Sequence, residues 1–237
     1  MNVYETKAIE DLISDNPYVV RGIVAGKSEN GKAAVAYFIM GRSNNSRNRV
    51  FTEKNGEVFT EPFDTSKVED PSLIIYAAIR RFGDKLIVTN GDQTDTVYDA
   101  FSQGKCFTSA LKTRSFEPDA PNFTPRISAV LDLSDPFSYK MSILKSADEK
   151  GSACNRFTFD YEPIGGVGHF IHTYVTDGNP IPSFMGEPER VAIPDSIDEF
   201  TSKLWNALNA DNKISLYVRY IDLATGKEEN RLINKNK

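Results

Sequence analysis

The chain has 237 residues, of which 40% are hydrophobic and 26% are charged. This length and composition suffice for a substantial hydrophobic core and fit one domain, residues 1–237, better than two. With 28 basic and 33 acidic side chains, the net charge is -5, which disfavours general binding to polyanionic nucleic acids. No apolar run approaches the length of about 20 residues that a bilayer requires, so we expect a cytoplasmic protein with no membrane partner.

The first part of the chain is expected to form hairpins between two helices. Asn30-Gly31 and Asn55-Gly56 each lie between runs of β-branched and aromatic residues, a pattern typical of hairpin turns. Asp70 as a cap and Pro71 as a first helical residue predict a helix start. The expected elements are a helix at 3–14 within an N-terminal extension at 1–17, strands at 18–27 and 33–42, a strand pair near 50–60, and a helix at 73–82.

The second part is predicted to be richer in strands. Ser196 and Glu199 match a capping box, so a helix is expected to start there. Two prolines make the loop at 116–124 extended. The remaining expected elements are strands at 85–89, 127–133, 138–146, 157–162 and 214–223, a helix at 94–103, and a polar tail. Hairpins with interspersed helices predict an α+β fold in which helices cover sheets.

Two acid-free segments, 30–52 and 100–116, carry the chain's local positive charge. Arginine presents a planar, permanently charged fork that suits phosphate. The two segments could therefore hold one phosphate group of a small anionic substrate. A solvated basic face is an equally acceptable interpretation of the same pattern.

Several common site types find no support in the sequence. His169 and His172 are three residues apart in a predicted strand, so their side chains point to opposite faces. Cys106 and Cys154 lack the CxxC spacing of zinc or redox sites. The Gly165–Gly168 segment lacks the Lys and Ser/Thr of a P-loop. We therefore expect no metal and no cofactor.

Four polar motifs point to a known family. They are Asn48-Arg49; Val88-Thr89-Asn90-Gly91 with Thr94-Asp95; Asn122-Phe123-Thr124-Pro125-Arg126-Ile127; and Asn179-Pro180-Ile181-Pro182-Ser183-Phe184 with Gly186-Glu187-Pro188. In this order they resemble the archaeal-type IMP cyclohydrolase family, whereas the segments at 1–17 and 195–237 match poorly. The resemblance implies a four-layer αββα sandwich related to N-terminal-nucleophile (Ntn) hydrolases. It also implies closure of 5-formamidoimidazole-4-carboxamide ribonucleotide (FAICAR) to IMP and water, the last step of purine synthesis.

The match to the family also implies which residues do the chemistry. Arg49, Tyr76 and Glu117 are the expected catalytic residues, with Arg49 polarising the formyl oxygen and the other two carrying protons. Without the family match, Tyr76 would be interpreted as a core tyrosine and Glu117 as a solvated acid. Arg42, Ser43 and Arg126 are expected to bind the substrate near its phosphate. The residues expected near the ribose or the ring are Asn90, Gly91, Asn122 and Thr124.

Two other functions remain open at this stage. One is an Ntn-type amide hydrolase, which would need processing to expose a nucleophile; the strand expected at Tyr18 is preceded by Asn16-Pro17 and not by Ser, Thr or Cys. The other is a non-catalytic protein that binds a purine nucleotide. In each case the expected partner is a small-molecule purine ribonucleotide, and a homo-oligomer is compatible with the sequence.

Overall fold

The computed structural model describes residues 2, 4–68 and 75–236. Its helices are α1 (Ile9–Ile13), α2 (Asn44–Arg47), α3 (Gln93–Ser102), α4 (Phe107–Leu111) and α5 (Ile197–Ala207), with a 3-10 turn at Thr65–Lys67. Its strands are β1 (Arg21–Lys27), β2 (Lys32–Met40), β3 (Val50–Lys54), β4 (Glu57–Glu61), β5 (Tyr76–Phe82), β6 (Lys85–Thr89), β7 (Arg126–Asp132), β8 (Ser138–Ser146), β9 (Cys154–Tyr161), β10 (Val167–His172), β11 (Glu189–Ala192), β12 (Lys213–Asp222) and β13 (Glu228–Asn234). The α+β class expected from the sequence is confirmed.

The strands form two antiparallel sheets. The six-stranded sheet has the order β11-β10-β1-β2-β12-β13, and the seven-stranded sheet runs from β3 to β9 in chain order. Asn55 and Gly56 both have positive φ, 54° and 78°, as the tightest hairpin turns require, so the Asn-Gly signal correctly placed the β3–β4 turn. Strand β12 pairs with β2 along nearly its whole length, so the C-terminal region is an integral part of the six-stranded sheet.

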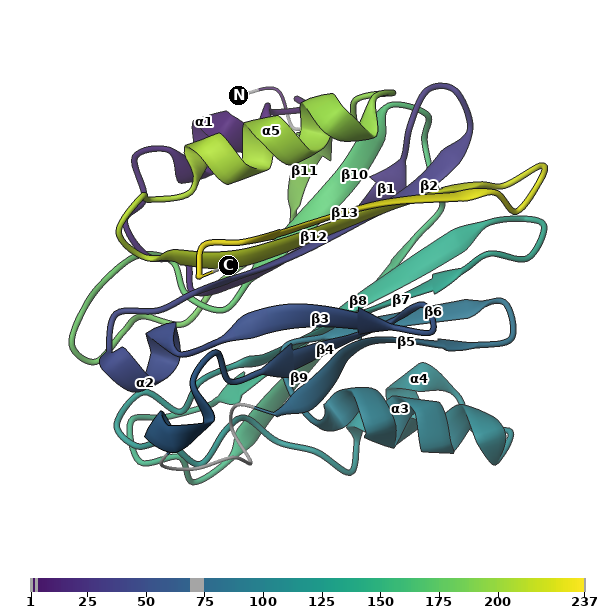
Figure 1. Cartoon of the computed structure of the whole chain (residues 1–237). Coiled ribbons are helices and arrows are strands. Elements are labelled where there is room, and N and C mark those ends of the chain that lie inside the picture. The colour runs from purple at the N-terminus through teal and green to yellow at the C-terminus, as the bar shows by residue number, and fades with distance from the viewer. Residues whose placement is uncertain (1, 3, 69–74, 237) are drawn as a thin grey trace.

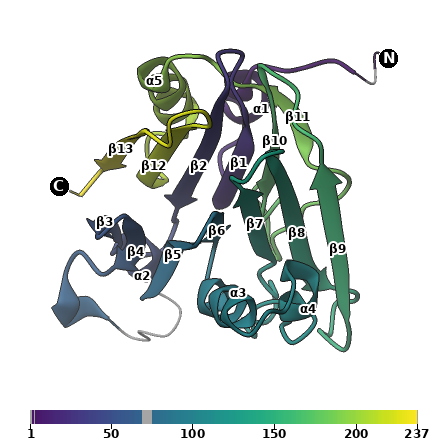
Figure 2. The ribbon, with the colours of Figure 1, turned by 90° about the vertical axis from the view of Figure 1, so that its right-hand side faces the viewer.

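Three hydrophobic clusters hold the layers together. The largest lies between the sheets, where Tyr37 of β2 stacks on Phe51 of β3 with ring centroids 5.4 Å apart. A second cluster lies between the six-stranded sheet and helices α1 and α5, and a third between the seven-stranded sheet and helices α3 and α4. Figures 1 and 2 show the same arrangement from two sides, with the two sheets face to face and these helices on the outer faces.

One expected element is wrong. The predicted helix at 73–82 is strand β5 from Tyr76 to Phe82, which pairs with β4 and β6. A short apolar run fits a buried strand as well as a buried helix, and here pairing on both sides decides for the strand. Asp70 and Pro71, which suggested the helix start, lie outside the described residues.

Other expectations need adjustment at the ends of the chain and in the loops. Helix α1 has five residues, Ile9–Ile13, against the twelve predicted at 3–14. The expected polar tail contains β13, which pairs with β12; an edge strand with one solvent-facing side can be polar and still form a ladder. Helices α2 and α4 and strand β11 were not expected.

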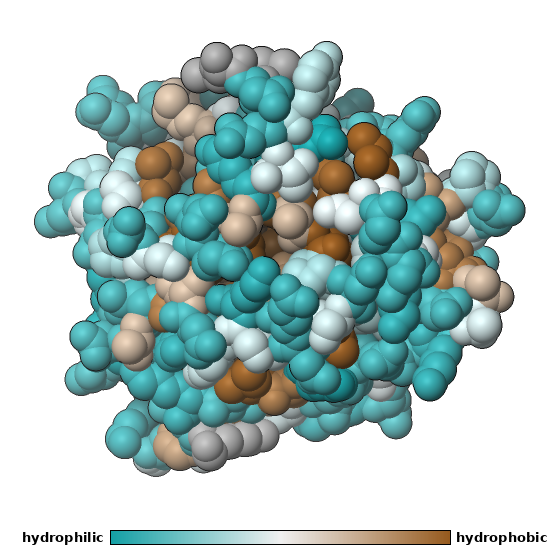
Figure 3. All heavy atoms as spheres, turned by 90° about the horizontal axis from the view of Figure 1, so that it is seen from above, coloured by the Kyte–Doolittle hydropathy of each residue, from teal (hydrophilic) through white to brown (hydrophobic). Residues whose placement is uncertain are grey.

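The outer face above α1 and α5 is largely hydrophilic, and hydrophobic residues appear there only in small separate areas (Figure 3). The longest helix in the described ranges, α5, has 11 residues. No helix in that part of the chain is long and apolar enough to cross a bilayer, which takes about 20 residues.

Candidate active site

A polar cavity of about 310 Å³ opens at one end of the two sheets. Its lining comes from segments next to strand ends of both sheets. The lining residues are Tyr18, Val20, Arg21, Arg42, Ser43, Ser46, Arg49, Glu117, Asp119, Asn122, Thr124, Tyr174 and Ile181. Five predicted site residues besides Arg49 are thus brought together with it: Arg42, Ser43, Glu117, Asn122 and Thr124. The volume lies at the lower end of the range for small-molecule sites.

Two buried guanidinium groups, Arg21 and Arg49, dominate the cavity. Arg21 donates from Nη1 to the carbonyl of Met40 at 3.3 Å, but its Nε has no acceptor among the described residues. The same holds for Nε and Nη1 of Arg49. Buried donors are normally hydrogen-bonded, so these three guanidinium nitrogens retain hydrogen-bonding capacity that suits an anionic or strongly polar ligand.

Burial and mutual repulsion act on the two arginines differently. Burial, followed by the neighbouring charge of Arg21, lowers the pKa of Arg49 to about 10, which leaves it cationic at neutral pH. Burial also opposes ionisation of Arg21, but the nearby Tyr76, Tyr37 and Glu117 outweigh it and raise the pKa of Arg21. Both groups therefore stay positively charged.

Arg21 is held by its backbone. The preceding residue, Val20, has φ of 67°, a left-handed conformation that is unfavourable for a β-branched residue. The Arg21 N–H donates to Oγ1 of Thr173 at 3.2 Å and to the carbonyl of Val19 at 3.0 Å. The Arg21 carbonyl accepts from the Thr173 N–H at 3.0 Å. These bonds fix the point from which the guanidinium enters the cavity.

Glu117 is a densely surrounded carboxyl group in the cavity wall. Its side chain keeps some exposed surface, but protein atoms surround it densely, and this burial raises its pKa. The charges of Arg21, Arg126 and Arg49 act in the opposite direction, and Asp119 adds to the rise. The net effect favours the protonated carboxyl, a state that can donate a proton.

Tyr76, the first residue of β5 and a predicted catalytic residue, is not among the residues that line the cavity. Its hydroxyl lies 2.9 Å from that of Tyr37 on β2, and either can donate. Burial, and next the proximity of Tyr76, raises the pKa of Tyr37 well above its usual value, so this phenol stays neutral. Arg21 and Arg49 both interact electrostatically with Tyr76 and with Tyr37. The four side chains therefore form one cluster.

The loop before β7 shapes one wall. Asp119 accepts from the Thr124 backbone N–H at 2.6 Å and from its hydroxyl. A hydroxyl has one proton, so the Thr124 oxygen must accept from the hydroxyl of Tyr174, 2.6 Å away. Asn122 accepts from the N–H of Ile181 at 3.1 Å. The predicted residues Asn122 and Thr124 thus connect this loop to the loop after β10.

Arg42 and Ser43 lie at the more exposed side. Arg42 forms an ion pair with Asp177 and lies over the ring of Tyr18, 4.7 Å from its centroid. The Ser43 hydroxyl accepts from the Ser46 N–H at 3.1 Å and caps α2. Arg42 is the cation in the lining that solvent reaches most easily.

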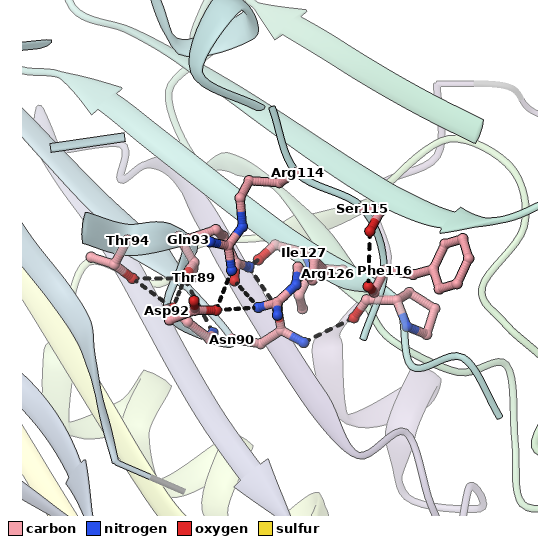
Figure 4. Close-up of polar contacts among 12 residues, drawn as sticks. Thr89, Asn90, Asp92, Gln93, Thr94, Arg114, Ser115, Phe116, Arg126 and Ile127 are labelled. Atoms are coloured by element: carbon pink, nitrogen blue, oxygen red, sulfur yellow. Dashed lines mark hydrogen bonds and ion pairs between the residues drawn. The ribbon is translucent and has the colours of Figure 1, made fainter. Parts of the chain in front are cut away.

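The remaining predicted residues, Asn90, Gly91 and Arg126, are not among the residues that line the cavity. Figure 4 shows Asn90 and Arg126 in a polar network with Asp92 and Gln93. Arg126 donates to Asp92 and to the side-chain oxygen of Gln93, each at 2.7 Å. The side-chain oxygen of Asn90, which directly follows β6, accepts from the Ile127 N–H of β7 at 2.9 Å. These partners occupy Arg126, which acts on the cavity through its charge near Glu117.

Gly91 is required by space in this network. A Cβ at this position would lie 2.6 Å from Nη1 of Arg126 and 2.7 Å from Oε1 of Gln93. It would also lie 3.7 Å from Oε1 of Glu117. Any larger residue would therefore displace the groups that border the carboxylate.

Sequence reasoning missed Arg21, Tyr37 and Asp119. Arg21 and Tyr37 lie inside apolar runs that predict strands, and an isolated polar residue there carries no local signal. Asp119 lies two residues from Glu117 in a loop that resembles any solvated turn. Within the described ranges, no group of three or more His, Cys, Asp or Glu side chains could hold a metal ion.

A family model described as "IMP cyclohydrolase-like protein" matches residues 18–227. The chain belongs to this family. The resemblance seen in the four motifs is thereby confirmed, and the match reaches well into the C-terminal region that the sequence alone left unmatched.

Curated proteins named IMP cyclohydrolase are similar to this chain. Those of Methanopyrus kandleri and Methanococcus aeolicus are 32% and 33% identical over 119 residues, and one of Methanococcus maripaludis is 32% identical over 125 residues. The aligned segments cover 48%, 48% and 51% of this chain and 59%, 58% and 61% of those proteins. The chain thus matches less than two thirds of its relatives' length.

Proposed function

We propose that this protein is an IMP cyclohydrolase that closes FAICAR to IMP with loss of water. The observation that carries the proposal is the pair of buried arginines, Arg21 and Arg49, which line one cavity with Glu117 and have guanidinium nitrogens that no group in the described residues accepts from. The substrate is a purine ribonucleotide, and its polar, anionic character suits such a cavity. Family membership and the names of the relatives support the same reaction.

The chemistry asks little of the enzyme beyond positioning and charge. The carboxamide nitrogen of the substrate attacks the formyl carbon, the carbonyl oxygen gains negative charge, and this oxygen then leaves as water. Holding the two reacting groups together removes much of the entropic cost of the first step. Preorganised donors then stabilise the developing charge, and no covalent intermediate is required.

Arg49 and Arg21 are the proposed donors to that oxygen. Each guanidinium has at least one buried N–H that no group in the described residues accepts. Such donors need no reorganisation when charge develops, because they are fixed before the reaction. Glu117, whose pKa is raised by burial, is the proposed acid that protonates the departing oxygen. Tyr76, hydrogen-bonded to Tyr37, is proposed to pass the proton released by the carboxamide.

The phosphate is proposed to bind at the exposed side of the cavity. Arg42 is 41% exposed there and is paired with a carboxylate, Asp177, that is 39% exposed. An exposed ion pair is worth little in free energy, so a phosphate can replace Asp177 as the partner of Arg42 at small cost. Asn122 and Thr124 are then placed to contact the ribose or the ring.

The proposal is tested by incubating the protein with FAICAR and measuring IMP by chromatography. Arg49→Ala, Tyr76→Phe and Glu117→Gln should each lower kcat by about 100-fold or more. Arg231→Ala is the matched control, because Arg231 pairs with Asp198 on the surface. No IMP from the wild-type protein would refute the function. Wild-type activity with all three variants unimpaired would refute only the assignment of residues.

The two alternatives have their own tests. An Ntn-type amide hydrolase should lose N-terminal residues to expose a nucleophile, which intact mass spectrometry would detect. A non-catalytic purine nucleotide-binding protein should bind IMP in calorimetry without converting FAICAR. The buried Arg21 and Arg49 support both binding and turnover, and the raised pKa of Glu117 favours turnover.

We also propose that the layered arrangement is the αββα sandwich of the Ntn-hydrolase fold and that residues 1–237 form a single domain. The two facing sheets with helices on their outer faces are consistent with that fold (Figure 1). Pairing of β12 with β2 supports a single domain, since the two ends of the chain share one sheet. A cytoplasmic location stays a prediction.

A further inference from the structure

Strand β9 is an open edge of the seven-stranded sheet. It runs for eight residues, Cys154–Tyr161, beside β8 without a register shift, contains no proline, and lies at the outer side in Figure 2. Natural proteins usually blunt such edges with prolines, bulges, like charges or a covering segment. Within the described ranges, no strand pairs with its outer side.

Contacts with other segments engage the other sheet edges to different extents. Strand β11 has four residues, and Lys7 covers it by accepting from the Ala192 N–H at 2.9 Å and donating to the Arg190 carbonyl at 3.1 Å. On the opposite side, Asn234 of β13 exchanges two hydrogen bonds with the backbone of Phe51 in β3, at 2.8 and 3.0 Å. β9 is therefore the edge best suited to a partner strand.

The hydrogen bonds of β8 show which groups of β9 point outward. The Ala153 carbonyl accepts from the Ala147 N–H at 2.9 Å, and the Phe157 carbonyl accepts from the hydroxyl of Ser142 at 2.8 Å. Odd-numbered residues of β9 thus turn their backbone groups toward β8. In an antiparallel ladder the alternate residues point the other way. Arg156, Thr158 and Asp160 therefore present their N–H and C=O groups outward.

These three positions are self-complementary. In an antiparallel pairing centred on Thr158, Thr158 lies opposite the partner's Thr158. Arg156 then lies opposite the partner's Asp160, and the same pair recurs on the other side of the two-fold axis. Within the subunit, Asp160 pairs with Lys140 and Arg156 donates to the Arg114 carbonyl, so the pairs across the axis would add to these contacts. Opposite charges directly across a ladder stabilise it, whereas like charges destabilise it. The outward backbone groups of the three residues meet as hydrogen-bonded pairs.

The side chains on the other face fit the same register. Phe157, which is 44% exposed, lies opposite the partner's Phe159, and aromatic pairs are favourable across strands. Lys145 lies over the Phe157 ring and donates to the Phe184 carbonyl at 2.7 Å. Met185, the next residue in the chain, is 73% exposed.

We propose that β9 pairs with β9 of a second copy of this chain, antiparallel about a two-fold axis at Thr158, and that the two seven-stranded sheets become one continuous sheet. A closed two-fold interface is the commonest arrangement of homo-oligomers. A contact limited to one strand and its flanking side chains is small, so we expect a dissociation constant on the order of 1 to 100 μM.

The test is sedimentation velocity of the full chain from about 1 to 200 μM, a range that brackets the expected dissociation constant. The mass of the wild-type protein should rise with concentration from 26.5 kDa towards twice that value. Arg156→Asp or Asp160→Arg places like charges opposite each other twice and should weaken the dimer by at least about tenfold. The double variant restores opposite charges and should restore the dimer, which an effect on folding alone would not do.

Thr158→Pro gives a second, independent test. The Thr158 N–H points away from β8, so proline removes no bond within the subunit but removes two from the interface, one donated by each copy. Lys54→Asp is the control, a charge reversal in the other edge strand of the same sheet, β3, where Lys54 is 60% exposed. It should leave the dimer intact. A wild-type protein that stays monomeric at 200 μM, or a dimer that resists both Thr158→Pro and the single charge reversals, would overturn the proposal.

Discussion

At the scale of single residues, the cavity combines two buried cations with a carboxyl group whose charged form is disfavoured. Arg21 and Arg49 repel each other, and this repulsion contributes to the lowered pKa of Arg49. An ionised Glu117 would reduce the repulsion between the two arginines. Burial raises the pKa of Glu117, however, and so disfavours its ionised form. An anionic ligand would relieve the repulsion and leave the carboxyl free to keep its proton.

Arg21 is the residue whose role is easiest to separate from a structural one. We expect Arg21→Ala to lower kcat for FAICAR by about 100-fold, the usual effect of removing one preorganised donor. Arg21→Lys keeps the charge but loses the fork and should recover part of that loss. Arg231→Ala should match the wild-type protein. A fall in melting temperature with kcat intact in both Arg21 variants would reduce Arg21 to a structural residue.

The raised pKa of Glu117 predicts how stability depends on pH. Above the unfolded pKa of about 4.3, the folded state holds this proton more tightly than the unfolded chain does. The contribution of Glu117 to the free energy of unfolding is therefore complete at low pH and is lost as pH rises through its folded pKa. Glu117→Gln mimics the protonated carboxyl, so it should melt higher than the wild-type protein at pH 8.

The same comparison at pH 4 provides the control. There Glu117 is largely protonated in both states, so the difference in melting temperature between Glu117→Gln and the wild-type protein should shrink. Urea unfolding at both pH values would measure the two free energies directly. If Glu117→Gln is less stable than the wild-type protein at pH 8, the prediction is contradicted. The neighbouring arginines would then stabilise the ionised Glu117 by more than burial destabilises it.

At the scale of elements, local signals predicted turns and caps better than they predicted buried runs. Asn55-Gly56 correctly placed the β3–β4 turn, and Ser196 caps α5 by accepting from the Glu199 N–H. Both depend on short-range patterns. The buried run at Tyr76–Phe82 became a strand because β4 and β6 pair with it, and such long-range pairing leaves no local trace.

The cap of α5 gives a prediction for this scale. Ser196→Ala removes the acceptor for the Glu199 N–H, 3.3 Å away, and should lower the free energy of unfolding by about 1 kcal/mol. Cyclohydrolase activity should not change, because α5 lies on the outer face of the six-stranded sheet (Figure 1). Ser202→Ala, in the interior of the same exposed helix surface, is the control and should be neutral or slightly stabilising.

The candidate site could be predicted only in part for a similar reason. The family match pointed to residues in loops, where Arg49, Glu117, Asn122 and Thr124 lie. It gave no means of separating cavity residues from supporting ones, so Arg126 was expected beside the phosphate although Asp92 and Gln93 hold it. That distinction depends on side-chain partners, which spacing along the chain does not encode.

At the scale of the whole molecule, the cavity lies where the ends of both sheets converge. Arg21 begins β1 of the six-stranded sheet, whereas Arg49 directly precedes β3, and Tyr76 begins β5, of the seven-stranded one. A ligand bound to all three therefore bridges the two halves of the fold. Ligands that bind only the folded state raise its stability by mass action.

This bridging predicts a thermal shift that depends on the proposed function. IMP at about 100 times its dissociation constant should stabilise the protein by about 2.7 kcal/mol, or roughly 5 to 10 °C in melting temperature for a chain of this size. Differential scanning fluorimetry would measure it, with inorganic phosphate as the control ligand. Arg49→Ala should lose most of the shift, and an equal shift in that variant would contradict the assignment.

The backbone at Val20 has a consequence for how this cavity can change over evolution. A β-branched residue at φ of 67° carries a conformational cost of roughly 1 to 3 kcal/mol, which its hydrogen-bonded surroundings must outweigh. Glycine at position 20 would remove this conformational cost, but it would also make the backbone more flexible and the Arg21 guanidinium less precisely positioned. We therefore expect selection for thermal robustness and selection for turnover to pull this position in opposite directions.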